Sequence, residues 1–589
     1  MDFKRSLTAA SRMVATQRGL STAMAWGRVG RVGAIVLSSL LASPPCLAWP
    51  WQVPLPSMHR AQSVAKPNAN AKSHATSPGH LPTLVYCSEA APIGFDPAPQ
   101  DSGVDFTASA ETLYNRLIEF KRGTWEVEPA LATHWDISPD GRVYTLHLRR
   151  DVHFHTTPYF SPTRQMNADD VIWSFHRLLD PQHAFNLAYP KHFSLFSRMP
   201  TGELIEQCEK IDDYTVRITL KAPSASFVKQ LAMSFMSILS AEYGQRLLAR
   251  GHAAEINTKP IGTGPFVFHS YAEGDTIRYD GNKQYWKKDA VKLSKLIFDI
   301  TPNASVRLHK LKRDECQVAA YPPLADLAAL RSYSDIVVLS EQGQNTSFMT
   351  YNVQHPALQQ LAVRQALDMA IDRKAIVRGV YLNAAEVAHS VLPSFGKRAA
   401  AVPAVSRYDP AQAKALLSKA GYEHGFDVNL WAISIERPYN PNARLMAELI
   451  QADWARIGVR AHISVQEPGV FYSRIFAGRH DVALLGWGRD VDDPDFWLPP
   501  ILGCPKAKGA MRHRWCNESL DALMRRASET SDATSRQALY QQVEDIAAAQ
   551  LPISPIAHAT VFQAVRASVD GLSVGPLLDA RFDGVTRDE

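Results

Sequence analysis

The chain has 589 residues, 46% of them hydrophobic and 21% charged, a composition typical of globular proteins that excludes a disordered or fibrous chain. Its length predicts more than one folding unit. The net charge of +5 comes from the first 80 residues, which hold nine Lys and Arg but one acid, so the remaining 54 basic and 57 acidic residues exclude the basic footprint of a nucleic-acid-binding protein.

The amino-terminal segment, residues 1–48, has the features of a secretory signal peptide. Two arginines precede the apolar run of residues 32–42 (VGAIVLSSLLA), and small residues suited to cleavage follow it. The run is shorter than the roughly 20 residues that cross a bilayer. Residues 49–82 are rich in Pro, Ala, Ser and Asn without periodicity, which predicts a flexible leader. We therefore expect export to the periplasm, with a lipid anchor on Cys46 as the alternative.

Beyond the leader, strand-like and helix-like segments alternate, which predicts an α/β fold. Residues 143–148 (VYTLHL) and 214–220 (YTVRITL) alternate with period two after turn-forming residues, as strands do. Gly262 and Gly264 lack the Lys-Ser/Thr of a phosphate loop, and we expect them at a tight crossing between lobes.

Helices are predicted where apolar residues recur at helical spacing. These segments are residues 171–179, 363–380, 410–420 and 445–454. Asn167 can cap the first of them, and Asp409 with Pro410 can open the third, which Gly421 closes.

Five cysteines remain after the signal peptide, and an exported chain permits disulfides. The spacing of Cys504 and Cys516 suits a short closed loop, whereas a bond between Cys87 and Cys316 would join distant segments. Cys208 is then left over. A zinc site is the alternative, but the close cysteine pairs that it needs are absent from the sequence.

Two motifs resemble parts of a catalytic site or a metal site, but each lacks the further residues that such a site needs. Residues 571–575 (GLSVG) match the nucleophile elbow of serine hydrolases, yet no histidine follows Ser573, since the last one is His558. His153 and His155 could share a strand face as metal ligands, but no third ligand stands at a diagnostic spacing. We therefore predict a non-enzymatic protein without a metal site or cofactor.

The densest acidic run follows a predicted strand at residues 482–485 and Trp487. Its members are Asp490, Asp492, Asp493 and Asp495. Such carboxylates can cap a helix, bind calcium or hold a ligand. Pro494 and the lack of the invariant glycine argue against an EF-hand loop, and the composition favours the helix cap.

Several blocks of the sequence resemble the extracellular solute-binding proteins of family 5, the peptide- and nickel-binding receptors of ABC importers, and in particular their dipeptide-binding branch. The blocks are residues 83–89 (TLVYCSE), 113–117 (LYNRL), 260–266 (PIGTGPF), 437–444 (RPYNPNAR) and 451–454 (QADW). The resemblance covers residues 81–585 and implies a periplasmic receptor, expected to be monomeric, that delivers a short peptide to an inner-membrane permease and its ATPases.

The resemblance also implies the two-lobed periplasmic-binding-protein fold of cluster C type, with a two-strand hinge. The first lobe would comprise residues 81–343 and 560–589, with an extra subdomain inserted at about residues 115–260. The second lobe would comprise residues 344–559. The pairs Cys87–Cys316 and Cys504–Cys516 match the family's disulfides.

Two residues carry the expected ligand recognition. By resemblance, Arg437 binds the peptide carboxylate and Asp490 binds its ammonium group, which suits a planar guanidinium and an ionised carboxylate. The further expected ligand-binding residues are Ser102, Gly103, Tyr439, Trp487 and Gly488. The alternatives are a surface salt bridge for Arg437 and a helix cap for Asp490.

The ligand itself stays open at this point. Arg489 could neutralise Asp490, and extra acids nearby could favour a cationic or larger ligand. Relatives of this fold take haem or antimicrobial peptides, which makes these the alternative ligands. A secreted peptide hydrolase is the alternative from another functional class.

Overall fold

The computed structural model describes most of the chain beyond the leader. The described residues are 81–588 except 101, 200, 394–406, 489–490, 505–513 and 573–579. The predicted signal peptide, nearly the whole leader, Ser573, Arg489 and Asp490 therefore lie outside them. No helix in the described ranges combines the length and hydrophobicity that a membrane crossing requires.

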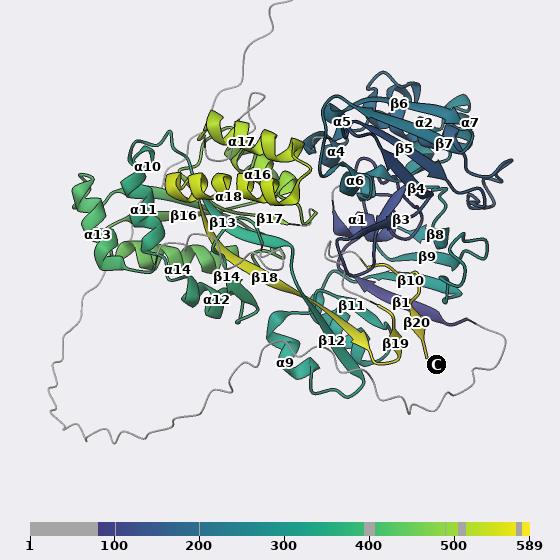
Figure 1. The fold of residues 1–589 in the computed structure, drawn as a ribbon. Helices are drawn as coiled ribbons and strands as arrows, with labels where there is room; N and C mark the ends of the chain where they lie inside the picture. Colours follow the sequence, from purple (N-terminus) through teal and green to yellow (C-terminus); the bar gives the residue numbers. More distant parts are fainter. Residues whose placement is uncertain are drawn as a thin grey trace, which may run out of the picture. The chain divides into compact units, whose positions relative to one another are not determined.

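A mixed sheet of 12 strands forms the centre of the described chain (Figure 1). Its strands are β1 (Thr83–Ser88), β8 (Phe266–Ala272), β9 (Thr276–Gly281), β10 (Lys295–Ile300), β11 (Val318–Ala320), β12 (Ile336–Gln342), β13 (Asn345–Tyr351), β14 (Ala385–Val387), β15 (Asp427–Ile433), β16 (Arg460–Gln466), β17 (Val482–Gly488) and β18 (Ile553–Arg566). The order is β16-β15-β17-β13-β18-β11-β1-β10-β9-β8, with β12 and β14 also paired to β18.

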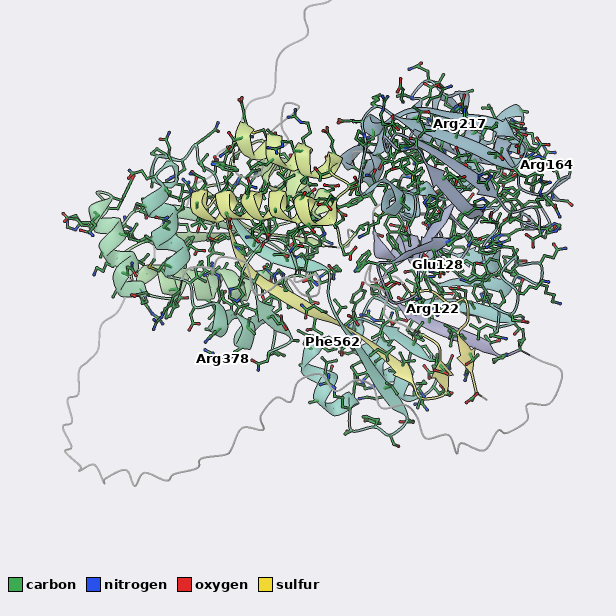
Figure 2. The ribbon with its side chains drawn as sticks, in the orientation of Figure 1. Arg122, Glu128, Arg164, Arg217, Arg378 and Phe562 are labelled. Carbon is green, nitrogen blue, oxygen red and sulfur yellow. A yellow bond between two sulfur atoms is a disulfide. The ribbon has the colours of Figure 1, made fainter. Side chains whose placement is uncertain are left out.

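The long strand β18 joins the two halves of this sheet. Its first part pairs with β13, where Thr350 lies opposite Ile553, and its last part pairs with β12. Phe562, labelled in Figure 2, lies in that last part opposite Ser340. β12 ends at Gln342, opposite Thr560 of β18, and β13 begins at Asn345. The chain between them therefore passes from one half of the sheet to the other beside β18.

A separate antiparallel sheet lies between β1 and β8 in the sequence. Its order is β4 (Ala132–Ile137), β5 (Val143–Leu148), β7 (Thr215–Leu220) and β6 (Ile205–Asp212). On β5, the buried residues Tyr144, Leu146 and Leu148 alternate with partly exposed ones, so one face of this sheet is buried. The helix α2 (Ala168–Leu179) packs against the sheet. Two small strand pairs complete the β-structure, namely β2 (Ile118–Phe120) with β3 (Val127–Pro129) and β19 (Val569–Asp570) with β20 (Thr586–Arg587).

Helices pack against both sheets, and in the half of the main sheet that contains β13 and β17 they lie on both sides (Figure 1). In the first part of the chain they are α1 (Gly103–Ala108), α3 (Ala184–Ala188), α4 (Ser194–Arg198), α5 (Thr201–Leu204), α6 (Phe227–Gln230), α7 (Ala241–Ala249), α8 (Ala304–Lys312) and α9 (Leu327–Leu330). Later in the chain they are α10 (Pro356–Gln359), α11 (Leu361–Met369), α12 (Arg373–Val380), α13 (Pro410–Lys419), α14 (Ala443–Ala455), α15 (Pro468–Phe476), α16 (Pro494–Leu502), α17 (Glu518–Glu529) and α18 (Ala533–Gln550).

Most predicted elements are present. The strand at 143–148 is β5, and Asn167 caps α2 in a capping box completed by the Asp170 side chain. The single helix predicted at residues 363–380 is wrong. Two helices, α11 and α12, replace it, because Asp372 accepts a hydrogen bond from Ala375 N (2.9 Å) and starts a new helix.

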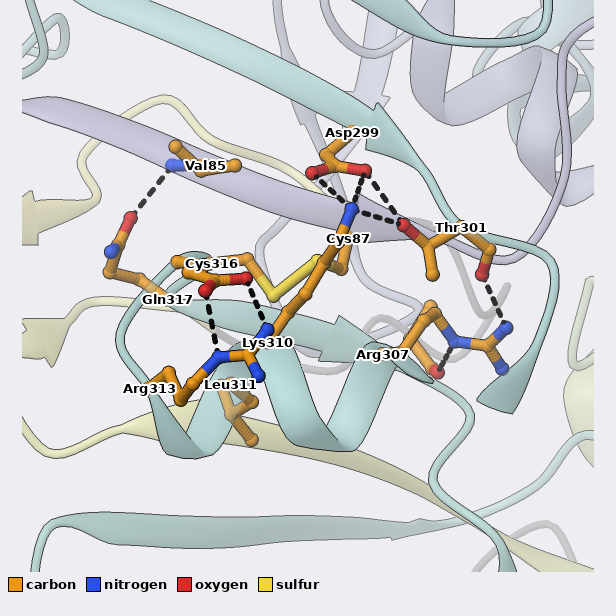
Figure 3. The surroundings of a disulfide bond; sticks show 12 residues. Val85, Cys87, Asp299, Thr301, Arg307, Lys310, Leu311, Arg313, Cys316 and Gln317 are labelled. Carbon is orange, nitrogen blue, oxygen red and sulfur yellow. Dashed lines mark hydrogen bonds and ion pairs between the residues drawn. A yellow bond between two sulfur atoms is a disulfide. The ribbon is translucent and has the colours of Figure 1, made fainter. Parts of the chain in front are cut away.

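Two disulfides link the cysteines as the sequence predicted. Cys87 of β1 is bonded to Cys316, 229 residues away, beside the Lys310–Asp299 ion pair of 2.7 Å (Figure 3). Cys504 is bonded to Cys516. Cys208 is a buried free thiol of β6, and its burial raises its pKa to about 12, so it stays protonated at neutral pH.

The glycine loop, which was expected at a tight crossing between lobes, packs against the segment before β2. A Cβ on Gly262 or Gly264 would come within 1.9 Å of Leu113 O or 2.4 Å of Leu113 C, so the loop lies against the segment before β2. His155 is held by the same loop, since its Nε2 lies 3.0 Å from Gly264 O and its Nδ1 accepts from Gly262 N. Both ring nitrogens are thus occupied, which makes His155 a structural residue rather than a metal ligand.

Burial gives His155 a pH-dependent effect on stability. It lowers the pKa of His155 from 6.5 to about 4, with the Gly264 carbonyl opposing the shift. The unfolded chain therefore takes up a proton below pH 6.5 that the folded chain refuses, so stability is lost as the pH falls. In urea unfolding, we expect the advantage of wild type over His155→Gln to shrink by about 1.4 kcal/mol per pH unit between pH 6.5 and 4. A pH-independent difference would contradict this.

Candidate ligand-binding site

The candidate site begins at the carboxyl ends of two neighbouring parallel strands. β15 and β17 pair in parallel, with Leu430 opposite Val482 and Trp431 opposite Ala483. Arg437 follows the end of β15 by four residues, and Asp490 follows the end of β17 by two. The carboxyl edge of parallel strands is where ligands bind in many α/β sheets.

A tight turn presents Arg437. Backbone hydrogen bonds of 3.0 and 2.9 Å run in both directions between Arg437 and Asn440, with Pro438 at the second position that β-turns favour. Asn440 is buried, and Asn442 caps α14 by accepting from Leu445 N at 2.9 Å. The RPYNPN block thus encodes a rigid turn followed by a helix start.

The Arg437 side chain is half-buried and has no acidic partner among the described residues. Its Nε atom is buried and makes no hydrogen bond there. A buried guanidinium N–H without an acceptor is costly. Among the described residues, Arg437 forms no salt bridge, and its ligand role stays a prediction.

Tyr439 lies flat against β17. A Cβ added to Gly486 would come within 2.1 Å of the Tyr439 ring, so only glycine fits at that point of the strand. The Tyr381 hydroxyl donates to Tyr439 O at 2.7 Å and so stabilises the backbone of the turn. The contact between Tyr439 and Gly486 brings the Arg437 turn next to the end of β17.

Trp487 and Gly488 are the last two residues of β17, paired with Thr346 and Asn345 of β13. Both are partly exposed. At Gly488 a Cβ would lie 3.1 Å from both Asn345 Cβ and Gln344 O, so a side chain would be crowded there. They lie on β17 close to the Tyr439 turn, and their expected ligand role remains a prediction.

Ser102 and Gly103 lie at the start of α1 in the other half of the molecule. Ser102 Oγ accepts from Asp105 N at 3.2 Å and is also hydrogen-bonded to the Asp105 carboxylate, while Gly103 is buried. Among the described residues, no hydrogen bond joins either of them to Arg437. Their observed role is to cap α1, and their expected ligand role remains a prediction.

The aspartates after residue 490 form ion pairs. Asp493 caps α16 by accepting from Asp495 N at 3.1 Å, so the helix-cap interpretation is confirmed for this residue. Arg536 of α18 contacts Asp493 and lies 2.8 Å from Asp495, and Asp492 lies 2.7 Å from Lys229. Burial raises the pKa of Asp495 to about 7, with Asp493 adding to the shift and Arg536 opposing it.

Sequence reasoning missed the partners of these acids. Arg536 stands more than 40 residues from Asp493, and Lys229 more than 260 from Asp492. Beside the Lys229 contact, Ala225 N donates to Ser528 O at 3.0 Å. These contacts join the segment around α6 to α17 and to the residues just before α16, and no local pattern in the sequence could have shown them.

The comparisons with known proteins agree with this architecture. The model of the family described as "Bacterial extracellular solute-binding proteins, family 5 Middle" matches residues 126–509, and the chain belongs to that family. Its fold is the two-lobed periplasmic-binding fold, as the sequence predicted.

Individual relatives are similar over nearly their full length. Di/tripeptide-binding protein 1 of Pseudomonas aeruginosa (strain UCBPP-PA14) is 47% identical over 497 residues, which cover 84% of this chain and 92% of that protein. Heme-binding protein A of Haemophilus influenzae is 38% identical over 90% of this chain and 96% of its own. A crystal structure of a dipeptide binding protein from Pseudoalteromonas sp. SM9913 with Met-Leu has a TM-score of 0.77, with 38% identity, 86% of this chain covered and 100% of that chain.

Proposed function

We propose that the protein is a periplasmic receptor that captures dipeptides or other short peptides and delivers them to an ABC importer. The observation that carries this proposal is the Arg437 guanidinium, which is half-buried, lacks an acceptor among the described residues and stands at the carboxyl edge of β15. A peptide carboxylate supplies two oxygens in the geometry that a guanidinium fork binds.

In this proposal Asp490 binds the peptide ammonium. It follows β17 by two residues, and β17 is the parallel neighbour of the strand that leads to Arg437. Ammonium and carboxylate would then be held at a set separation, so recognition depends on peptide length more than on side chains. Tyr439, Trp487 and Gly488 would line the space between the two charges.

Closure of the two lobes would complete the site. Residues 81–343 with 560–589 form the first lobe of this proposal, and residues 344–559 form the second. The pairing of β18 with both β12 and β13 supports a two-strand hinge at these boundaries. Ligand binding would favour the closed form because only that form contacts the peptide from both lobes. A permease with its ATPases would then accept the closed, monomeric receptor, and the receptor itself would catalyse no reaction.

Haem is the second candidate ligand, favoured by the 38% identity to a protein named Heme-binding protein A. A haem would occupy far more space than a dipeptide and would not need both termini of a peptide. The two candidates therefore predict different responses to blocking the peptide amine.

A calorimetric titration decides between them. The protein, unfolded and refolded to remove bound ligand, is titrated with Met-Leu, N-acetyl-Met-Leu, a tripeptide and haem. We expect micromolar or tighter binding of Met-Leu that is lost on acetylation, because the acetyl group removes the charge that Asp490 would bind. Binding of haem with a Soret shift, without peptide binding, would replace the peptide by haem. Binding of neither would overturn the proposal.

A further inference from the structure

Three side chains on the separate four-stranded sheet lie close together on its exposed face. They are His134 and Asp136 of β4 and His147 of β5, and one ligand atom from each lies within 4.8 Å of the other two. His147 Nε2 is 3.1 Å from Asp136 Oδ2, and the two imidazole rings stack with centroids 4.2 Å apart. We propose that this His134–Asp136–His147 cluster binds a divalent transition-metal ion of the zinc, copper and nickel class.

A β-bulge assembles the cluster. Ala132 pairs with Leu148, but His134 pairs with His147, so Thr133 is an extra residue in β4. Without it, His134 would lie opposite Leu146, whose side chain is buried. One inserted residue moves a strand's following side chains to the other face. The bulge therefore places His134 and Asp136 on the exposed face with His147, and the sequence alone predicted no metal site here.

The same extra residue sets the tautomer of His134. Thr133 Oγ1 lies 3.0 Å from His147 O and 3.0 Å from His134 Nδ1. A hydroxyl has one hydrogen, and the carbonyl can only accept, so that hydrogen goes to His147 O. His134 Nδ1 must then donate to the hydroxyl, which leaves the lone pair on Nε2. An orienting hydrogen bond on the nitrogen that does not bind metal is the usual support of a histidine ligand.

The charges around the cluster favour a cation. Asp136 lies 3.1 Å from His147 Nε2 and is within ion-pair distance of no Lys or Arg among the described residues. One cation on this sheet, Arg217 of β7 (Figure 2), is bonded to Glu209 at 3.3 Å. Two imidazoles and one carboxylate are a ligand set that suits zinc, nickel and copper better than calcium or magnesium. Water would complete the coordination, because His134 and Asp136 are exposed.

The chain contains a matched control for this cluster. His269 and Asp280, on β8 and β9, form an exposed histidine–aspartate pair with Nδ1 and Oδ2 2.8 Å apart. Among the described residues, no third histidine, cysteine or carboxylate lies close enough to this pair to complete a metal site. If the second imidazole makes the site, His269 should contribute nothing to tight metal binding.

Zinc titration calorimetry tests the proposal, on the full chain purified without a polyhistidine tag. We expect one ion bound per chain, with His134→Ala and His147→Ala each weakening the affinity by at least about tenfold and Thr133→Val by about tenfold through the lost support. His269→Ala should bind zinc as wild type does. Equal zinc affinity of wild type and His147→Ala, or no saturable binding by wild type, would overturn the site.

A second measurement separates this site from the receptor function. Electron paramagnetic resonance of the Cu²⁺-loaded protein should show two imidazole nitrogens, reduced to one in His147→Ala. Two nitrogens in that variant would contradict the assignment. Far-UV circular dichroism of the same variants should match wild type, which shows that they are folded, so the metal result stands whether or not the protein binds peptides.

Discussion

Arg437→Ala should weaken the binding of an unmodified dipeptide by about 10²–10³-fold or more. The substitution would leave the peptide carboxylate without its cationic partner, and breaking one side of a buried charge pair costs about 3–5 kcal/mol. The turn itself should persist, because it is held by backbone hydrogen bonds between Arg437 and Asn440 and by Tyr381. Calorimetric titration with Met-Leu measures the effect.

Two companion variants make this result specific. Arg437→Lys keeps the charge but loses the planar fork, so its affinity should fall between those of wild type and Arg437→Ala. Arg444 lies seven residues on and pairs with Glu448 on the surface, with its side chain 72% exposed. Arg444→Ala should bind as wild type does. Unchanged affinity of Arg437→Ala would remove Arg437 from the site.

Arg177→Met should lower the free energy of unfolding by about 3–5 kcal/mol. Arg177 of α2 and Asp96 have side chains only 1% and 0% exposed, and both guanidinium NH₂ groups bond to the carboxylate. Removing Arg177 leaves the buried Asp96 carboxylate without a counter-charge. This costs more stability than replacing both members of the pair by apolar residues. Urea unfolding followed by fluorescence measures the difference.

The double variant tests that reasoning. Replacing Asp96 by leucine in the Arg177→Met background removes the uncompensated charge, so much of the lost stability should return. Arg444→Met, at an exposed ion pair, should unfold close to wild type. If Arg177→Met were as stable as wild type, the buried pair would contribute nothing to the fold.

Features set by neighbouring residues could be predicted from the sequence. The strand β5, the cap at Asn167 and the cap at Asp409 all depend on residues within one turn of each other. The error at residues 363–380 is of the same kind, since Asp372 followed by Ala375 is a local cap that the apolar spacing concealed. The lobes, the disulfides and Arg437 came from resemblance to a family, not from periodicity.

Features set by strand pairing could not be predicted. The order of the main sheet, the bulge at Thr133 and the contacts of Arg536 and Lys229 join residues far apart in the chain. A single sequence carries no register between distant strands, so the three members of the His134–Asp136–His147 cluster looked unrelated. The ion pairs of Asp492 and Asp493 were hidden for the same reason.

The position of β18 in the sequence has a consequence for how the protein is made. β11, β12, β13 and β14 all pair with residues 553–566, so neither half of the main sheet is complete until that segment has been synthesised. Such distant pairings close slowly. A chain that emerges amino terminus first thus stays short of its native sheet during most of its translation.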